Sequence, residues 1–263
     1  MMFNCNLTTL HQYLDALANI IMTTTKSLNM KRKYILVGIA IVIIAILSYG
    51  FYYVNDYYHA DDEALKYMNG TDDVSVVKTS NGLFLDGPGN DTAVIFYPGA
   101  KVEYTSYLPL LTRLSSEGAD CFLVEMPFNI AFLGQNSADN IIDSYNYTSY
   151  YMAGHSLGGV VASNYINETN KSDGAILLES YSTKKIDKPV LSVFGSEDNL
   201  LNQKSYDEFK AMMGDNLKEV KIKGGNHAQI GDYGKQSGDG IAKITPKNQQ
   251  KQCVDAIIDF IEK

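Results

Sequence analysis

Tryptophan is absent from this chain of 263 residues, and proline and cysteine are scarce, with six and three copies. Three cysteines are too few for a disulfide scaffold, so the fold must depend on a hydrophobic core. A hydrophobic content of 45% is sufficient for such a core and excludes a disordered chain. We expect Cys121 and Cys253 to be two separate buried thiols rather than a bonded pair.

Basic residues are also few. The chain has 22 Lys and Arg against 30 Asp and Glu, which gives a net charge of −8. Binding to nucleic acid phosphates requires Lys and Arg concentrated on one face, and the one dense basic run is Lys31-Arg32-Lys33. We therefore expect no nucleic acid partner.

Charged side chains are missing altogether from residues 34–54. As a helix this segment would be about 31 Å long and would match the hydrocarbon core of a bilayer. Its bulky aromatic end, with Tyr52 and Tyr53, is unlike the small-residue cleavage site of a signal peptide. We predict a single transmembrane helix over 34–54 with the lipid bilayer as its partner, between a tail (1–33) and a juxtamembrane linker (55–70).

The charges on either side of this segment predict its orientation. Lys26, Lys31, Arg32 and Lys33 precede it, whereas Lys66 is the one basic residue among residues 55–74. The positive-inside rule then places the tail in the cytoplasm and everything after the helix on the extracytoplasmic side. Because Met30 begins a typical signal anchor, residues 1–29 are either a short cytoplasmic tail or the product of a mis-assigned start.

Residues 71–263 read as one domain in which eight apolar runs alternate with helical stretches. The alternation predicts an α/β fold with a mostly parallel eight-stranded sheet flanked by helices. The expected strands cover 74–77, 83–85, 93–97, 121–125, 150–153, 175–178, 190–194 and 217–222. The expected helices cover 104–117, 157–167, 203–213 and the segment from Pro246 to Ile261, with Thr245 as its N-cap.

The segment between the sixth and seventh runs, residues 179–189, is too short for a lid domain, so we expect an open, shallow pocket. No phosphate-binding glycine loop occurs in a strand-to-helix context. The glycine-rich segment 224–240 matches no calcium or zinc pattern and is more simply a flexible rim. We therefore expect neither a metal nor a cofactor.

A serine at a strand-to-helix corner is the most informative feature. In Gly154-His155-Ser156-Leu157-Gly158 the two glycines permit the sharp turn that exposes a nucleophilic serine. A serine hydroxyl needs an imidazole to take its proton and a carboxylate to hold that imidazole. Of the four histidines, His227 follows the last strand and fits this role. Asp198, which follows the seventh strand, is the expected acid, with Glu197 as the alternative.

Acyl transfer also requires two N–H donors for the oxyanion. Leu157 supplies one because it directly follows the serine at a helix N-terminus. The turn after the third strand supplies the other, from Ala100 or, alternatively, Lys101. Phe128 and Asn129, after the fourth strand, either line the acyl pocket or belong to the core.

Four segments together resemble the α/β-hydrolase superfamily. They are Tyr97-Pro98-Gly99-Ala100-Lys101-Val102, Met126-Pro127-Phe128-Asn129, Gly154-His155-Ser156-Leu157-Gly158-Gly159 and Gly224-Gly225-Asn226-His227-Ala228-Gln229. The similarity extends over about Asp61 to Lys263 and is greatest to the lidless fold-five branch, related in architecture to dienelactone hydrolases.

The resemblance implies a serine hydrolase for carboxylic esters or related small acyl compounds, with Ser156, Asp198 and His227 as the triad. Two positions depart from the pattern, since dienelactone hydrolases have cysteine where Ser156 stands and the usual His-Gly oxyanion signature is Pro98-Gly99 here. Two other functions stay open from sequence. An acyltransferase would use the same triad, and a catalytically idle binding module would keep the fold.

Overall fold

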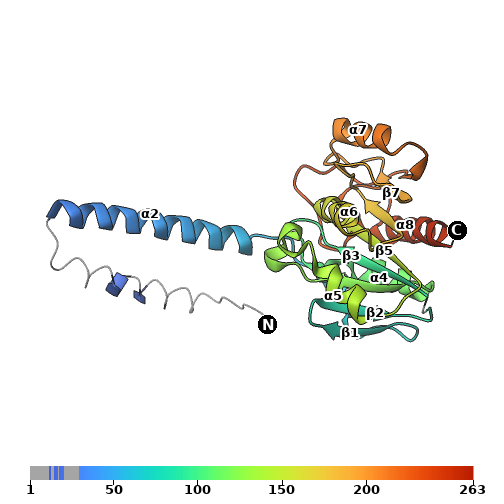
Figure 1. Cartoon of the computed structure of the whole chain (residues 1–263), viewed down its shortest axis with the longest axis horizontal. Coiled ribbons are helices and arrows are strands. Elements are labelled where there is room, and N and C mark those ends of the chain that lie inside the picture. Colours follow the sequence, from blue (N-terminus) through green and yellow to red (C-terminus); the bar gives the residue numbers. More distant parts are fainter. Residues whose placement is uncertain (1–11, 13–14, 17, 21–29, 90, 263) are drawn as a thin grey trace. The chain divides into compact units, whose positions relative to one another are not determined.

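We describe the protein from a computed structural model, which defines residues 12, 15, 16, 18–20, 30–89 and 91–262 (Figure 1). The chain forms two compact units, Met1–Asp56 and Tyr57–Lys263. Most of the expected tail, residues 1–33, lies outside the described residues.

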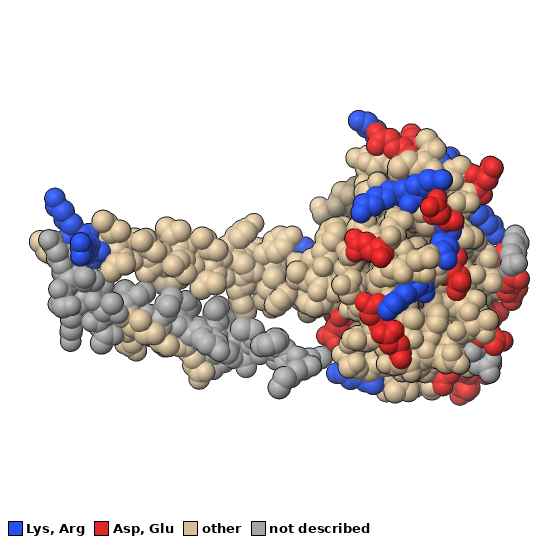
Figure 2. Space-filling model, in the orientation of Figure 1, with Lys and Arg blue, Asp and Glu red and all other residues tan. Residues whose placement is uncertain are grey.

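The first unit contains one long apolar helix, α2 (Met30–Asn55), in which an 18-residue window has a mean hydropathy of 2.5. It includes the predicted span 34–54 and extends four residues before it, over Lys31, Arg32 and Lys33, which Figure 2 shows as a basic cluster at the start of the helix. None of its residues is buried inside the unit. The helix is thus long and apolar enough to cross a membrane.

The second unit is built on one sheet of eight strands in the order β1-β2-β4-β3-β5-β6-β7-β8. The strands β1 and β2 run antiparallel to their neighbours, and the others are parallel. All eight predicted runs are strands. Their bounds are β1 Ser75–Thr79, β2 Gly82–Asp86, β3 Thr92–Tyr97, β4 Asp120–Val124, β5 Ser149–His155, β6 Gly174–Leu178, β7 Val190–Gly195 and β8 Leu217–Ile222.

Helices cover both faces of this sheet (Figure 1). On one face α4 (Leu108–Ser116) and α8 (Pro246–Ile261) pack into a single apolar cluster with the strands. On the other face α5 (Ser137–Ser144), α6 (Leu157–Thr169) and α7 (Gln203–Met213) form a second cluster. Because the central strands are covered on both sides, β4 and β6 are buried at every residue and are apolar along most of their length.

Two differences from the expected helices have local causes. The single helix expected over 104–117 is a 3₁₀ turn, Tyr104–Tyr107, followed by α4, and Pro109 lies in the first turn of α4. Proline has no backbone N–H to donate to the carbonyl four residues earlier, so the regular helix begins with Pro109 in its first turn, where that N–H is not needed. The segment after β4, where no helix was expected, contains two 3₁₀ turns, Pro127–Asn129 and Ala131–Gly134, and then α5.

The segment after residue 56, expected as a linker, is hydrogen-bonded into the second unit. The backbone of Tyr58 bonds to Lys101 and Glu103, at 2.7 and 2.9 Å, and the N–H of Asp61 donates to the carbonyl of Asp232 at 2.9 Å. The short helix α3 (Asp62–Leu65), capped by Asp61, and the 3₁₀ turn Lys66–Asn69 follow. These bonds join the N-terminal edge of this unit to the loops after β3 and β8.

Two further expectations are confirmed. Cys121 in β4 and Cys253 in α8 are both free and buried, so they are separate thiols. The segment from Glu179 to Pro189, between β6 and β7, contains no helix. This connection therefore places no helical lid over the carboxyl ends of the central strands.

Candidate active site

Ser156 lies at the corner between β5 and α6. Its backbone is strained, with φ 52° and ψ −124°, a conformation that costs a non-glycine residue free energy and is concentrated at functional sites. The flanking glycines explain how the turn is possible. A Cβ atom on Gly158 would lie 2.1 Å from the carbonyl oxygen of Tyr97, and one on Gly154 would lie 2.5 Å from the backbone of Gly158. The elbow is therefore packed directly against the end of β3.

His227 and Asp198 are brought together from loops 29 residues apart. Nδ1 of His227 donates to Oδ2 of Asp198 at 2.8 Å, and the side chains are only 4% and 1% exposed. The other oxygen of Asp198 accepts from the backbone N–H groups of Leu200, at 2.6 Å, and Leu201, at 2.9 Å. The carboxylate is thus held by donors on both of its oxygens.

The electrostatics of Asp198 favour its ionised form. Burial raises the pKa of this carboxyl, but hydrogen bonds from His227 and Glu179 outweigh burial and lower the pKa to about 2. Glu197, the alternative acid, points elsewhere, since it accepts from the Ser196 hydroxyl and forms an ion pair with Lys243 at 2.8 Å. The geometry therefore pairs His227 with Asp198 and not with Glu197.

Ser156 and His227 both line a cavity of about 200 Å³ at the carboxyl ends of the strands. Its walls combine apolar side chains from α6 and from the loop after β7 with polar groups from the loop after β6. The lining residues are Ser156, Leu157, Val160, Glu179, Ser180, Tyr181, Leu200, Leu201, Asn202 and His227. The predicted nucleophile, its base and one predicted oxyanion donor thus share one cavity.

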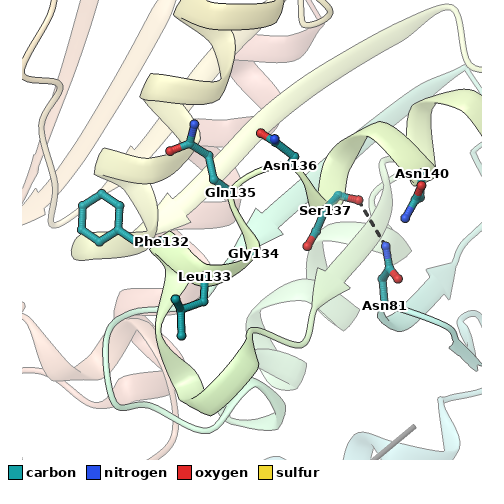
Figure 3. Close-up of a pocket in the computed structure, with 8 residues that line it drawn as sticks. All are labelled: Asn81, Phe132, Leu133, Gly134, Gln135, Asn136, Ser137 and Asn140. Atoms are coloured by element: carbon teal, nitrogen blue, oxygen red, sulfur yellow. Dashed lines mark hydrogen bonds between the residues drawn. The ribbon is translucent and has the colours of Figure 1, made fainter.

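A larger cavity, of about 370 Å³, lies elsewhere, around α5 and the turn before it. Figure 3 shows Asn81, Ser137 and Asn140 on one side and Phe132 and Leu133 on the other. The side-chain amide of Asn81 donates to the backbone oxygen of Ser137 at 3.3 Å. This cavity is lined by amides and contains no acid, base or nucleophile of the predicted triad, so we place the site in the smaller one.

The loop after β3 leaves one N–H group available as an oxyanion donor. The N–H of Gly99 donates to the hydroxyl of Tyr107 at 3.0 Å, and that of Lys101 donates to the carbonyl of Asn129 at 2.8 Å. Among the bonds of the described residues, the N–H of Ala100 between them has no acceptor. This pattern favours Ala100 over the alternative Lys101, although Ala100 itself does not line the cavity.

His155 connects the oxyanion loop to the loop of His227. Its Nε2 bonds to the backbone carbonyl of His227 at 3.1 Å, which requires a proton on Nε2, and its Nδ1 then accepts from the hydroxyl of Tyr107 at 2.8 Å. Burial, reinforced by His227, holds the pKa of His155 well below its ordinary value. A neutral chain of hydrogen bonds thus runs from Gly99 through Tyr107 and His155 to His227.

Phe128 and Asn129 do not line the cavity that contains Ser156. Both have a positive φ of 56°, and the Phe128 side chain is 55% exposed, so it is not a core residue. Asn129 contributes through its backbone, because its carbonyl holds the N–H of Lys101. Their sequence position placed them near the oxyanion loop, but their side chains are not directed into the cavity with the serine.

The glycine-rich segment 224–240 folds back on the histidine loop. The carboxylate of Asp239 accepts from the N–H groups of His227 and Ala228, at 3.3 and 2.9 Å. The side chain of Asn226 donates to the carbonyl of Gly240 at 2.8 Å. Asp239 therefore helps to fix the position of the histidine.

Sequence reasoning missed two buried polar residues beside the triad, Glu179 after β6 and Gln249 in α8, which are 1% and 0% exposed. The side-chain atoms of Glu179, Asp198 and His227 that could bind a metal lie within 4.8 Å of one another. Asp198 and His227 already bond to each other, and both carboxyl groups accept from backbone N–H groups. The signal for Glu179 was its place at the carboxyl end of a central strand, where sites form in such sheets.

Comparison with known proteins agrees with the fold. The model of the alpha/beta hydrolase family matches residues 93–251, more than half of the chain. No match was found among curated proteins. Solved structures with the same fold include TT1662 from Thermus thermophilus, with 12% identity and a TM-score of 0.55 over 72% of this chain and 99% of that one.

Two other similar structures are esterases by name. A ferulic acid esterase from Streptomyces cinnamoneus is 16% identical with a TM-score of 0.54, over 67% of this chain and 68% of that one. The carboxylesterase CesB from Bacillus subtilis is 13% identical with a TM-score of 0.52, over 76% of this chain and 95% of that one. At these identities the structures show the fold alone. Together with the match over 159 residues, the fold and the elbow lead to one conclusion: the chain belongs to the alpha/beta hydrolase family.

Proposed function

We propose that this hydrolase is a membrane-anchored serine esterase that cleaves carboxylic esters or related acyl compounds through an acyl-enzyme. The single observation that carries the proposal is that His227, which lines the same cavity as Ser156, is paired with Asp198 at 2.8 Å. The names of the two similar esterases agree with this chemistry.

The mechanism follows from these positions. Ser156 attacks the acyl carbon while His227 takes its proton, and Asp198 stabilises the imidazolium that forms. The N–H groups of Leu157, at the N-terminus of α6, and of Ala100 stabilise the oxyanion. His227 then returns the proton to the leaving group, and water releases the acyl group by the same route in reverse.

The volume of the cavity limits the size of the acyl group. Its volume of about 200 Å³ is below the range of about 300 to 1,000 Å³ that holds drug-sized ligands. Val160, Leu200 and Leu201 make one part of its lining apolar. A short acyl chain against these side chains, with the alcohol part left in solvent, fits this shape.

The helix α2 anchors the enzyme in this proposal. A span of 26 residues with basic residues at its start is typical of a signal anchor. The same charge distribution supports an extracytoplasmic location for the hydrolase unit.

A fluorophosphonate probe tests the proposal on the full-length protein in detergent. The wild-type protein should label, and Ser156→Ala should abolish labelling and ester hydrolysis. Asp198→Asn and His227→Ala should each lower kcat by about 10³-fold or more. Ser116→Ala, an exposed serine on α4, is the matched control and should label fully. A folded wild-type protein that neither labels nor hydrolyses any ester would refute the proposed function.

A further inference from the structure

Glu179 is a buried acid that the mechanism above does not use. It directly follows β6, its side chain is 1% exposed, and its backbone has a positive φ of 48°. A non-glycine residue in this region carries a local energetic cost that the surrounding structure must offset. The backbone is held there by a bond from its N–H to the carbonyl of Val193 at 2.8 Å.

The side chain of Glu179 is fully engaged. The N–H of Gly195, at the end of β7, donates to its two carboxyl oxygens at 2.8 and 3.0 Å. The amide of Gln249 in α8 donates to one of them at 3.2 Å. One carboxyl oxygen of Glu179 also lies within 4.8 Å of one carboxyl oxygen of Asp198. The residue therefore lies directly behind the acid of the triad.

Two carboxyl groups this close together in a buried cluster disfavour two negative charges, and a proton on one of them allows a hydrogen bond between them. Asp198 already accepts hydrogen bonds from Leu200, Leu201 and His227. An ionised carboxylate has about four acceptor sites, so the ionised form of Asp198 can accept these three bonds and one more from Glu179. Glu179 has fewer donors and is completely enclosed. The proton of the pair therefore belongs to Glu179.

We propose that Glu179 is a positioning residue of the triad, in which its neutral carboxylic acid donates a hydrogen bond to Asp198 and so orients that carboxylate toward His227. The inference rests on the proposed function. The chemistry is a fixed hydrogen bond from a buried acid, with no transfer of the proton during the reaction.

The groups around Glu179 are consistent with its neutral form. Burial, together with Asp198 and Asp239, raises the pKa of Glu179 well above its ordinary value. The other titratable groups that interact with it are neutral or shared with the triad: Tyr206, Tyr233, Cys253 and His227.

Two substitutions in the full-length protein separate the hydrogen bond from the charge. Glu179→Leu removes the donor and should lower kcat by about 10- to 100-fold with KM little changed, as loss of a partner behind a catalytic group does. Glu179→Gln keeps a neutral donor of similar shape, so it should recover most of that loss and leave the acid limb of the pH–rate profile unmoved. Glu208→Leu and Glu208→Gln, on the exposed face of α7, are the matched controls.

Two outcomes would overturn the inference. An ionised Glu179 would make Glu179→Gln shift the acid limb downward by about one pH unit or more, because a negative charge near the base would be lost. Equal kcat values for Glu179→Leu and wild type would show that the hydrogen bond does not position Asp198.

A spectroscopic measurement tests the proton without using catalysis. Infrared difference spectra of the wild-type protein and Glu179→Gln at neutral pH should show the carbonyl stretch of one buried, protonated carboxylic acid in the wild type. Its absence would refute the inference even if the enzyme is an esterase, and its presence in a protein that hydrolyses no ester would refute only the proposed function. A band that disappears on adding Zn²⁺ or Mg²⁺ would instead identify the three residues as a metal site.

Discussion

The two histidines at the site have opposite tasks, which their neighbours determine. His227 lines the cavity and bonds to a carboxylate, as the base of the proposed mechanism must. His155 is enclosed and bonds to a hydroxyl and a carbonyl, so it stays neutral and acts as a structural connection. A histidine within the elbow is thus part of the framework that aligns the oxyanion loop with the histidine loop.

At the residue scale, removal of the Tyr107 hydroxyl tests this connection. Tyr107→Phe leaves the N–H of Gly99 and Nδ1 of His155 without a partner in a buried site. Such unsatisfied groups cost about 1–3 kcal/mol, so urea unfolding should show a loss of this size. Hydrolysis should fall as well, because Gly99 adjoins Ala100. Tyr145→Phe, at an exposed aromatic, is the control, and equal losses in both variants would contradict the role of the hydroxyl.

The residues of the proposed triad are recognisable in the sequence because each occupies a characteristic place. Ser156 lies between two glycines after a strand, and Asp198 and His227 follow later strands. Tyr107, Glu179 and Gln249 could not be predicted, because they act on partners 48, 19 and 70 residues away along the chain. Nothing local in the sequence marks a side chain whose task is to hold another side chain.

At the scale of elements, the predicted strands were confirmed because each is an apolar run that ends in a turn. The helix α5 was missed, because it has eight residues and its N-cap, Asn136, makes no side-chain cap bond. Phe128 was placed beside the pocket by its order in the chain, but the positive φ of its backbone helps to direct the side chain outward. Short elements and turns with unusual backbone depend on tertiary packing that sequence periodicity does not report.

At the scale of elements, the elbow depends on close packing of the start of α6 against the end of β3. In Gly158→Ala the new Cβ would lie 2.1 and 2.3 Å from the backbone oxygens of Tyr97 and Pro98, so the helix must move away from the strand. We expect a loss of stability of about 1–3 kcal/mol or more. Activity should fall further than stability alone explains, because the N–H groups of Leu157 and Ala100 would separate.

The control for Gly158→Ala is Gly50→Ala, in α2. A Cβ on Gly50 has no atom within 4 Å, so this variant should fold and hydrolyse esters as the wild type does. Thermal unfolding and ester turnover of both variants are the measurements. Wild-type turnover in Gly158→Ala would show that the elbow does not depend on its contact with β3.

At the scale of the whole molecule, the chain combines one apolar helix with a hydrolase unit of mixed surface charge (Figure 2). The proposed anchor predicts that the protein stays in the membrane fraction after alkaline carbonate extraction. It also predicts on which side of the membrane the hydrolase unit lies. Lys31, Arg32 and Lys33 stand at the start of α2 and none of its last four residues is basic, so the unit should be extracytoplasmic.

Cysteine labelling in intact cells tests the predicted extracytoplasmic location of the hydrolase unit. Cys121 and Cys253 are buried, so in a Cys5→Ser background a new cysteine at Lys204, whose side chain is 87% exposed, is the accessible thiol of the hydrolase unit. A membrane-impermeant maleimide should label Lys204→Cys in intact cells as fully as in disrupted cells. The chain that keeps Cys5 and lacks the new cysteine is the control and should label only after disruption. If Lys204→Cys also requires disruption, the hydrolase unit is cytoplasmic and the charges before α2 do not set its orientation.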